Sequence, residues 1–269
     1  MPAPAPSSTL AFGDASLFSP LAPPLPRQTG ERLLWGRLYG AAAALAIASA
    51  ARAAKAPLLA VVPDMQAATV LRSELGFFLK DIQAQVPVLA FPDWETLPYD
   101  VFSPLPELVS ERLLTLHRLP GLTRGVLVVP VGTLLQRLPP RDYVDGHSLV
   151  LAKGDRLDLD RTRERLTRSG YQCVSQVIGH GEFAVRGALM DIFPMGSSLP
   201  LRIDLFDNEI DSIRTFDPDS QRSIDKLDRV RMLPAREFPF TEEAISAFRQ
   251  RWRARIEGEL LPGMRREAT

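Results

Sequence analysis

Arginine and aromatic residues that could hold a partner protein alternate with aliphatic residues in the segment 201–206. Side chains of an extended strand point alternately to the two faces of a sheet. A strand here therefore places its aliphatic residues on one face and Arg202, Asp204 and Phe206 on the other. Arg186 takes the same outward position in an earlier alternating segment. Because arginine and aromatic side chains are frequent anchors of interfaces, we consider a protein-binding surface, with mere covering of a neighbouring strand by Phe206 as the alternative.

The segment 39–46 is the best candidate for a phosphate-binding loop. A loop of the G-x-x-x-x-G-K-[ST] type uses backbone amides to cradle phosphate, a lysine to meet its charge and a Ser/Thr hydroxyl to hold magnesium. The segment has one glycine, Gly40, and lacks both the lysine and the Ser/Thr hydroxyl. We therefore interpret it as the start of an apolar helix, and nucleotide hydrolysis by this chain is unsupported.

Other reactive side chains give weaker signals. Cys173 has no histidine close to it in the sequence, so we expect a buried structural thiol rather than a nucleophile. The acidic residues between 204 and 211 suit the solvated end of a hairpin better than a metal or acid/base site. The three histidines are widely separated and lack ligand spacing. We therefore predict neither catalytic nor metal-binding residues.

Two aromatic segments could contact nucleic acid. Trp94 and Tyr99 lie in a loop whose nearby charges are acidic, whereas base-stacking sites need neighbouring Lys or Arg. A packed structural loop is the better interpretation. Four arginines alternate from Arg249 to Arg255 in a predicted helix and so spread around it. A solvated helix that partly covers a neighbour through Phe248 and Trp252 is favoured there, and DNA contact remains the alternative.

The composition of the chain limits the classes of protein to which it can belong. The chain has 269 residues, with 32 Lys and Arg against 32 Asp and Glu, so its formal net charge is zero. A net charge of zero argues against binding of nucleic acid over the whole surface, although it permits a local basic patch. A single cysteine excludes an internal disulfide and fits a reducing cytoplasm. The apolar stretch 41–51 is too short for a bilayer span of about 20 residues, so we expect a cytoplasmic protein without membrane contact.

The expected elements divide the chain into four parts. Residues 1–30 contain seven of the 24 prolines, a pattern that predicts a disordered tail. Residues 31–147 alternate helix and strand, which predicts an α/β subdomain with a parallel sheet. Its expected strands are 57–62, 86–91 and 125–131, and its expected helices are 31–54 with a break near Gly40, 65–79, 107–117 and 132–137.

The second half of the chain predicts a different architecture. Residues 148–233 form a compact α+β domain with a run of strands joined by turns, many of them antiparallel. Its expected helix is 159–169, with arginines on its outer face and Gly170 as its end. Its expected strands are 148–151, 182–193, 201–206, 210–216 and 230–233, with 171–177 extended. Residues 234–269 begin a new helix, with Thr241 as its N-cap.

Five segments resemble the amino-terminal part of the bacterial transcription-repair coupling factor family (Mfd). They are residues 91–100, 124–131, 181–196, 203–214 and 216–222. These motifs are long and specific, and the resemblance runs from about residue 32 to the end of the chain. This part of the family is itself similar to the nucleotide-excision-repair protein UvrB.

The resemblance implies a role for each part. Residues 31–147 resemble a UvrB-like α/β subdomain whose P-loop is degenerate in coupling factors, and residues 234–269 resemble the start of its second half, a partial third subdomain. Residues 148–233 resemble the UvrB interaction domain, which binds UvrA. The family's contact positions carry over to Arg186, Arg202 and Phe206, the same outward residues that the alternation indicates.

Coupling factors are several times longer, with an RNA-polymerase-binding module and a translocase motor downstream. The resemblance therefore implies a truncated chain, which would reach RNA polymerase and DNA only through the missing domains. It also implies that this chain has no cofactor of its own, although the full-length family uses ATP. We expect a non-enzymatic adaptor that recruits UvrA in transcription-coupled nucleotide-excision repair. The alternative is part of an ATP-dependent DNA translocase or helicase that binds nucleotide and DNA.

Overall fold

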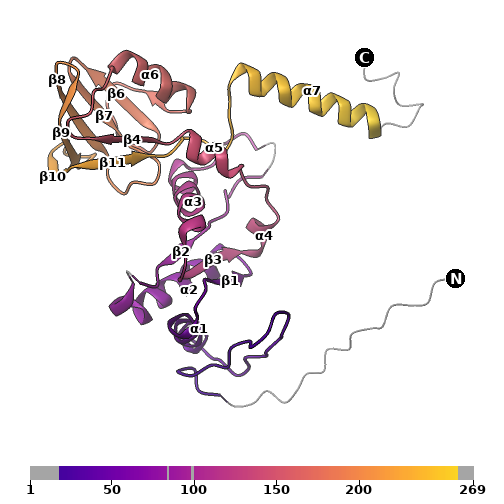
Figure 1. Ribbon diagram of the computed structural model, residues 1–269. Helices are drawn as coiled ribbons and strands as arrows, with labels where there is room; N and C mark the ends of the chain where they lie inside the picture. The colour runs from indigo at the N-terminus through magenta and orange to yellow at the C-terminus, as the bar shows by residue number, and fades with distance from the viewer. Residues whose placement is uncertain (1–17, 84, 98–99, 260–269) are drawn as a thin grey trace. The chain divides into compact units, whose positions relative to one another are not determined.

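The computed structural model describes residues 18–83, 85–97 and 100–259 of the chain. It separates into two compact units, coloured along the chain in Figure 1. Unit 1 comprises the residues up to 93 together with 121–136, and unit 2 comprises 94–120 together with the residues from 137 onward. The chain therefore passes from one unit to the other three times.

Unit 1 contains the predicted parallel sheet. Strand β3 (Val126–Pro130) lies between β1 (Leu58–Val62) and β2 (Val88–Ala90), and both neighbours run parallel to it. Helices α1 (Ala42–Ala53) and α2 (Met65–Phe78) pack against this sheet in one apolar cluster. Short alanine side chains on α1 allow the close approach of that helix, since five of them are buried.

Helix α2 begins where the sequence predicts. The carboxylate of Asp64 accepts a hydrogen bond from the amide of Ala67 at 2.8 Å, which is the N-cap arrangement. The other short helices of this unit are η1 (Lys80–Ile82) and α4 (Val131–Leu134).

The predicted helix before Gly40 is wrong. Residues 31–39 have no regular secondary structure, and only the second predicted piece forms α1. Arg37 has a φ of 59°, which a right-handed helix cannot contain, and Gly40 follows with a φ of 53°. Of the predicted proline-rich tail, residues 18–30 contain neither helix nor strand, and residues 1–17 lie outside the described residues.

Unit 2 is built on a mixed sheet of six strands, in which antiparallel pairs dominate. The strand order is β10-β9-β8-β7-β6-β5, and only the pair β5 and β6 is parallel. The strands are β5 (Gln172–Cys173), β6 (Glu182–Arg186), β7 (Leu189–Ile192), β8 (Leu201–Phe206), β9 (Glu209–Phe216) and β10 (Ser223–Leu227). The mixed α/β fold class predicted from the sequence, with a parallel sheet followed by antiparallel strands, is confirmed.

The predicted single strand 182–193 is in fact a hairpin. Gly187 forms the turn between β6 and β7 with a φ of 60°, a conformation that glycine adopts without steric penalty. Strand β10 was not predicted, because four of its five residues are exposed and its two apolar residues, Ile224 and Leu227, are three positions apart and so do not alternate regularly.

Helix α6 (Leu159–Arg168) covers the inner face of the six-stranded sheet. Its buried residues Thr162 and Leu166 face the core, and Gly170 with a φ of 94° ends the helix as predicted. A separate two-stranded sheet lies against the same core and is formed by β4 (Leu149–Ala152) and β11 (Arg229–Met232).

Three further α-helices belong to unit 2. Helix α3 (Pro106–Arg118) contributes Leu113 to the same core, and α5 (Arg141–Gly146) contributes Val144. The short 3-10 helix η2 (Leu119–Gly121) follows α3, and α7 (Glu242–Glu259) follows the last strand. Within the described part of the chain, none of the helices combines the length and apolar character needed to cross a bilayer.

Candidate protein-interaction surface

The outer face of the six-stranded sheet carries the residues that the alternation in the sequence indicates. Across the strands, Asp191 of β7, Arg202 of β8 and Arg214 of β9 are directly opposite one another. The aliphatic residues of β8 are buried against the inner core, whereas Arg202 is half-buried and Phe206 is exposed. The predicted division of this strand into two faces is confirmed.

Arg202 is held in one orientation by three kinds of contact. Its Nε and Nη2 donate to the two carboxylate oxygens of Asp191 at 2.8 and 2.9 Å, and its Nη1 donates to the carbonyl of Gln221 at 3.1 Å. Its guanidinium carbon also lies 4.7 Å from the centre of the Phe216 ring. The hydrogen bond with Asp191 raises the pKa of Arg202, so the side chain stays charged. Arg202 thus presents a fixed, partly neutralised cation.

Arg186 ends β6 beside the Gly187 turn, and its side chain is exposed. Its Nη2 donates to the backbone carbonyl of Ser175 at 2.5 Å. Because this acceptor is neutral, the contact orients the guanidinium and leaves its positive charge available to an acidic partner group.

Phe206 is 76% exposed at the end of β8. The next residue, Asp207, has a φ of 56° and starts the tight turn to β9, so the backbone fixes Phe206 at a corner of the sheet. An exposed ring on a rigid strand loses little conformational freedom when a partner covers it, which favours its use as an anchor.

The acidic residues near this corner either contact neighbouring side chains or face solvent. Asp204 accepts hydrogen bonds from Ser212 at 2.8 Å and from Arg214, with which it also forms an ion pair. Asp207 and Glu209 are exposed at the hairpin end, as predicted. Among the described residues, no group of three potential metal ligands comes together.

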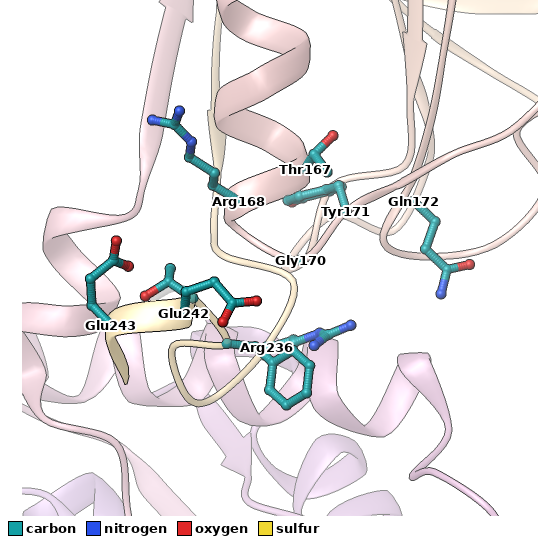
Figure 2. Close-up of a pocket in the computed structure, with 10 residues that line it drawn as sticks. Thr167, Arg168, Gly170, Tyr171, Gln172, Arg236, Glu242 and Glu243 are labelled. Carbon is teal, nitrogen blue, oxygen red and sulfur yellow. The ribbon is translucent and has the colours of Figure 1, made fainter. Parts of the chain in front are cut away.

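A hollow of about 760 Å³ opens in unit 2 between the end of α6 and the start of α7. Figure 2 shows its lining, with Arg236 on the segment that leads into α7 and with Glu242 and Glu243 in the first turn of that helix. Hydrogen bonds from the backbone and from Thr241 lower the pKa of Glu243, with a smaller contribution from Arg168. The lining mixes both signs of charge, so it favours a structural role in starting α7 over recognition of one kind of charged ligand.

Trp94 is part of a buried ion-pair cluster, in agreement with its interpretation as a packed loop residue. Its indole Nε1 donates to Glu237 at 3.0 Å, and the same carboxylate pairs with Arg112 at 2.5 Å. Arg112 is completely buried, and its guanidinium carbon lies 4.5 Å from the centre of the Trp94 ring. Tyr99 lies outside the described residues. The partners are 125 and 143 positions apart, so local sequence patterns could not reveal this cluster.

The predicted burial of Cys173 is wrong. Strand β5 is only two residues long and lies at the edge of the sheet, so both of its side chains are exposed. Nη2 of Arg163 lies 3.6 Å from the sulfur.

The two remaining candidate segments are ordinary helices in the structure. Residues 39–46 lead into α1, and Ala44 and Ala46 are fully buried there. In α7 the rings of Phe248 and Trp252 stack on each other and stay 60% and 49% exposed. The prediction that they cover a neighbour is therefore wrong for the described residues.

Comparison with known proteins identifies the region that carries the outer face. Residues 149–238 match the UvrB interaction domain family. This match contains Arg186, Arg202 and Phe206 together with α6 and the whole six-stranded sheet.

Most of the chain is similar to transcription-repair-coupling factors. It is 48% identical to that of Escherichia coli (strain K12) over 87% of the chain, and 44% identical to that of Haemophilus influenzae over 86%. It is 32% identical to that of Bacillus subtilis (strain 168) over 77% of the chain. The chain spans about a fifth of the length of these relatives. The resemblance seen in the sequence is thus confirmed.

Proposed function

We propose that this chain serves transcription-repair coupling as an adaptor that recruits UvrA through the outer face of its six-stranded sheet. The observation that carries the proposal is the exposed, rigidly held Phe206 on the same face as Arg186 and Arg202, inside the region that matches the UvrB interaction domain. The similarity to transcription-repair-coupling factors supports the process.

The proposed binding combines apolar burial with charge pairing. Covering the exposed ring of Phe206 removes apolar surface from water, which favours association. Acidic groups of UvrA pair with Arg186, whose present contact is a neutral carbonyl. Arg202 is already paired with Asp191. The N–H groups of its guanidinium that remain available are held in a fixed orientation, so their binding to UvrA costs little conformational entropy.

We further propose that the chain performs no catalysis and needs no cofactor, in line with the lack of a P-loop lysine and Ser/Thr hydroxyl in residues 39–46. RNA polymerase would then be reached through parts of the longer relatives that this chain does not span. An ATPase assay with and without DNA is expected to give the background rate. A rate that a substitution in residues 39–46 abolishes would favour the alternative, an ATP-dependent DNA translocase.

The UvrA proposal is tested by pull-down with the double variant R186A/F206A. Both side chains are exposed, so the circular-dichroism spectrum and the melting temperature should be unchanged while UvrA binding is lost. The matched control is F248A/R249A, which removes the same two side-chain types from the exposed surface of α7. Undiminished UvrA binding by R186A/F206A, or equal loss in the control, would contradict the proposal.

A further inference from the structure

Helix α6 carries a stripe of arginines on the surface of unit 2. Arg161, Arg165 and Arg168 are separated by four and three residues, so they lie on one side of the helix. The stripe extends over about 10 Å at 1.5 Å per residue. The side chains of Arg161 and Arg168 are 89% and 77% exposed. The stripe therefore concentrates positive charge in a chain whose net charge is zero.

The stripe continues into a hollow of about 400 Å³ beside strand β4. Arg156, Arg161 and Arg165 line this hollow together with Asp155, Asp158 and residues of β4. Nη2 of Arg165 donates to the carbonyl of Ser148 at 3.1 Å, a neutral acceptor that orients the guanidinium without cancelling its charge. The three arginines outnumber the two carboxylates of the lining, and a concave surface with an excess of cations strengthens the local positive potential.

Three acidic groups nearby, Asp155, Asp158 and Glu164, are engaged with the backbone or are weakly paired. Asp158 caps α6 by accepting from the amide of Arg161 at 3.1 Å, and Asp155 accepts from the amide of Ala152 at 2.8 Å. The ion pairs of Arg161 with Asp158 and of Arg168 with Glu164 are 3.5 and 3.8 Å long and exposed. Such surface pairs are weak, so a phosphate group can replace the carboxylates as the partner of these arginines.

This stripe is separate from the proposed UvrA surface. Leu166 of α6 packs into the core on the inner face of the six-stranded sheet, whereas Arg186, Arg202 and Phe206 belong to its outer side. The outward positions of α6 are all polar, in contrast to the corner that presents Phe206. A surface of this kind lacks the aromatic anchors of protein interfaces and suits the repeated charge of a polyanion.

We infer that the arginine stripe of α6 binds the phosphate backbone of duplex DNA, without reading its sequence. B-DNA presents one negative charge per about 1.7 Å of its axis, so several phosphates lie within reach of a 10 Å stripe. Each guanidinium that contacts a phosphate releases condensed counterions, and binding therefore weakens as salt rises. An adaptor with this surface can hold DNA on one side of the domain and a protein on the other.

The inference is tested with the full chain and a fluorescein-labelled duplex of about 20 base pairs, by fluorescence anisotropy at several sodium chloride concentrations. Three phosphate contacts give a slope of log affinity against log salt of about −2.7, or about a 40-fold loss between 50 and 200 mM. The variant R161Q/R165Q should bind more weakly at low salt. Its slope should fall to about −0.9, or about a fourfold loss.

Two further variants test whether the arginine stripe itself is responsible for DNA binding. R251Q/R253Q removes the same charge from α7 and should bind DNA like the unaltered chain. R161K/R165K keeps the charge and should retain the steep salt dependence, because lysine also binds phosphate as a point charge.

The inference is overturned if R161Q/R165Q binds like the unaltered chain, or if the α7 variant loses binding equally. It is also overturned if polyglutamate of equal charge displaces the labelled duplex as well as unlabelled duplex does, because the stripe would then suit acidic proteins. Circular dichroism on each variant verifies that the fold is intact.

Discussion

The two faces of the six-stranded sheet are built from the same strands but held by different forces. On the inner face, Ile203 and Met190 are fully buried in one apolar core with α6 and the small β4–β11 sheet. On the outer face, Asp191 pairs with Arg202 and Asp204 pairs with Arg214. A large apolar core thus fixes the fold on the inner side, whereas the outer side combines oriented charges with a small apolar cluster that contains Ala184 and Phe216.

The comparison shows how one strand can serve stability and recognition at once. Because successive residues of β8 alternate between the faces, Ile203 and Phe206 are only three positions apart and have opposite surroundings. Substitutions on the two faces should therefore separate stability from binding.

The largest effect is expected from Ile203→Ala on the inner face. The side chain is fully buried, so its truncation leaves a cavity and should lower the free energy of unfolding by about 2–5 kcal/mol. Urea denaturation measures this change. A loss below about 1 kcal/mol would show that the inner face is less tightly packed than its burial indicates.

A smaller loss is expected from Asp191→Ala on the outer face. The side chain of Asp191 is 2% exposed and makes two hydrogen bonds to Arg202, which is itself 18% exposed. Removing these bonds should lower the free energy of unfolding by about 2–3 kcal/mol and release the guanidinium of Arg202. The exposed Asp211→Ala is the matched control and should leave thermal unfolding unchanged.

A pH-dependent effect is expected from Tyr171, a polar group within the inner core. Its hydroxyl donates to the carbonyl of Leu233 at 2.6 Å, and burial raises its pKa. The unfolded chain therefore ionises first, so stability should fall as the pH rises above about 10. Tyr171→Phe should lower stability by about 1–2 kcal/mol at neutral pH and make the alkaline decline shallower. An equally steep decline in this variant would assign the effect to other groups.

The smallest change in stability is expected from Phe206→Ala. The ring is 76% exposed, so the free energy of unfolding should change by less than about 0.5 kcal/mol. The sharpest test compares the thermal unfolding of this variant with that of Ile203→Ala, since both residues belong to one strand. A large loss would mean that Phe206 supports the fold rather than a partner.

Local sequence patterns were sufficient to predict those elements in which one physical effect dominates. The apolar runs of β1 and β3, the Asp64 N-cap of α2 and the alternation of β8 were all predicted from neighbouring residues. The outward positions of Arg186, Arg202 and Phe206 followed from the same alternation, whereas their roles as contacts rest on the family resemblance.

Features that depend on distant residues or on edges were missed. Strand β10 pairs with β9 although its own residues are mostly exposed and show no alternation, and Cys173 is exposed because β5 has a neighbour on one side only. The helix-forming residues before Gly40 did not form a helix, since Arg37 has a left-handed backbone conformation. The arginines of α6 are not among these features, since the sequence predicts them on the outer face of the helix 159–169 and the burial of Thr162 and Leu166 agrees.

The ion pair between Arg112 and Glu237 affects how the interaction domain can be isolated. A fragment cut at residues 149 and 238 would retain Glu237 and discard α3, leaving a buried carboxylate without its guanidinium and the Leu113 position in the core empty. Truncation of one partner of a buried pair is strongly destabilising. A soluble miniature of this domain should therefore include residues 94–120, spliced to the segment from 137 onward.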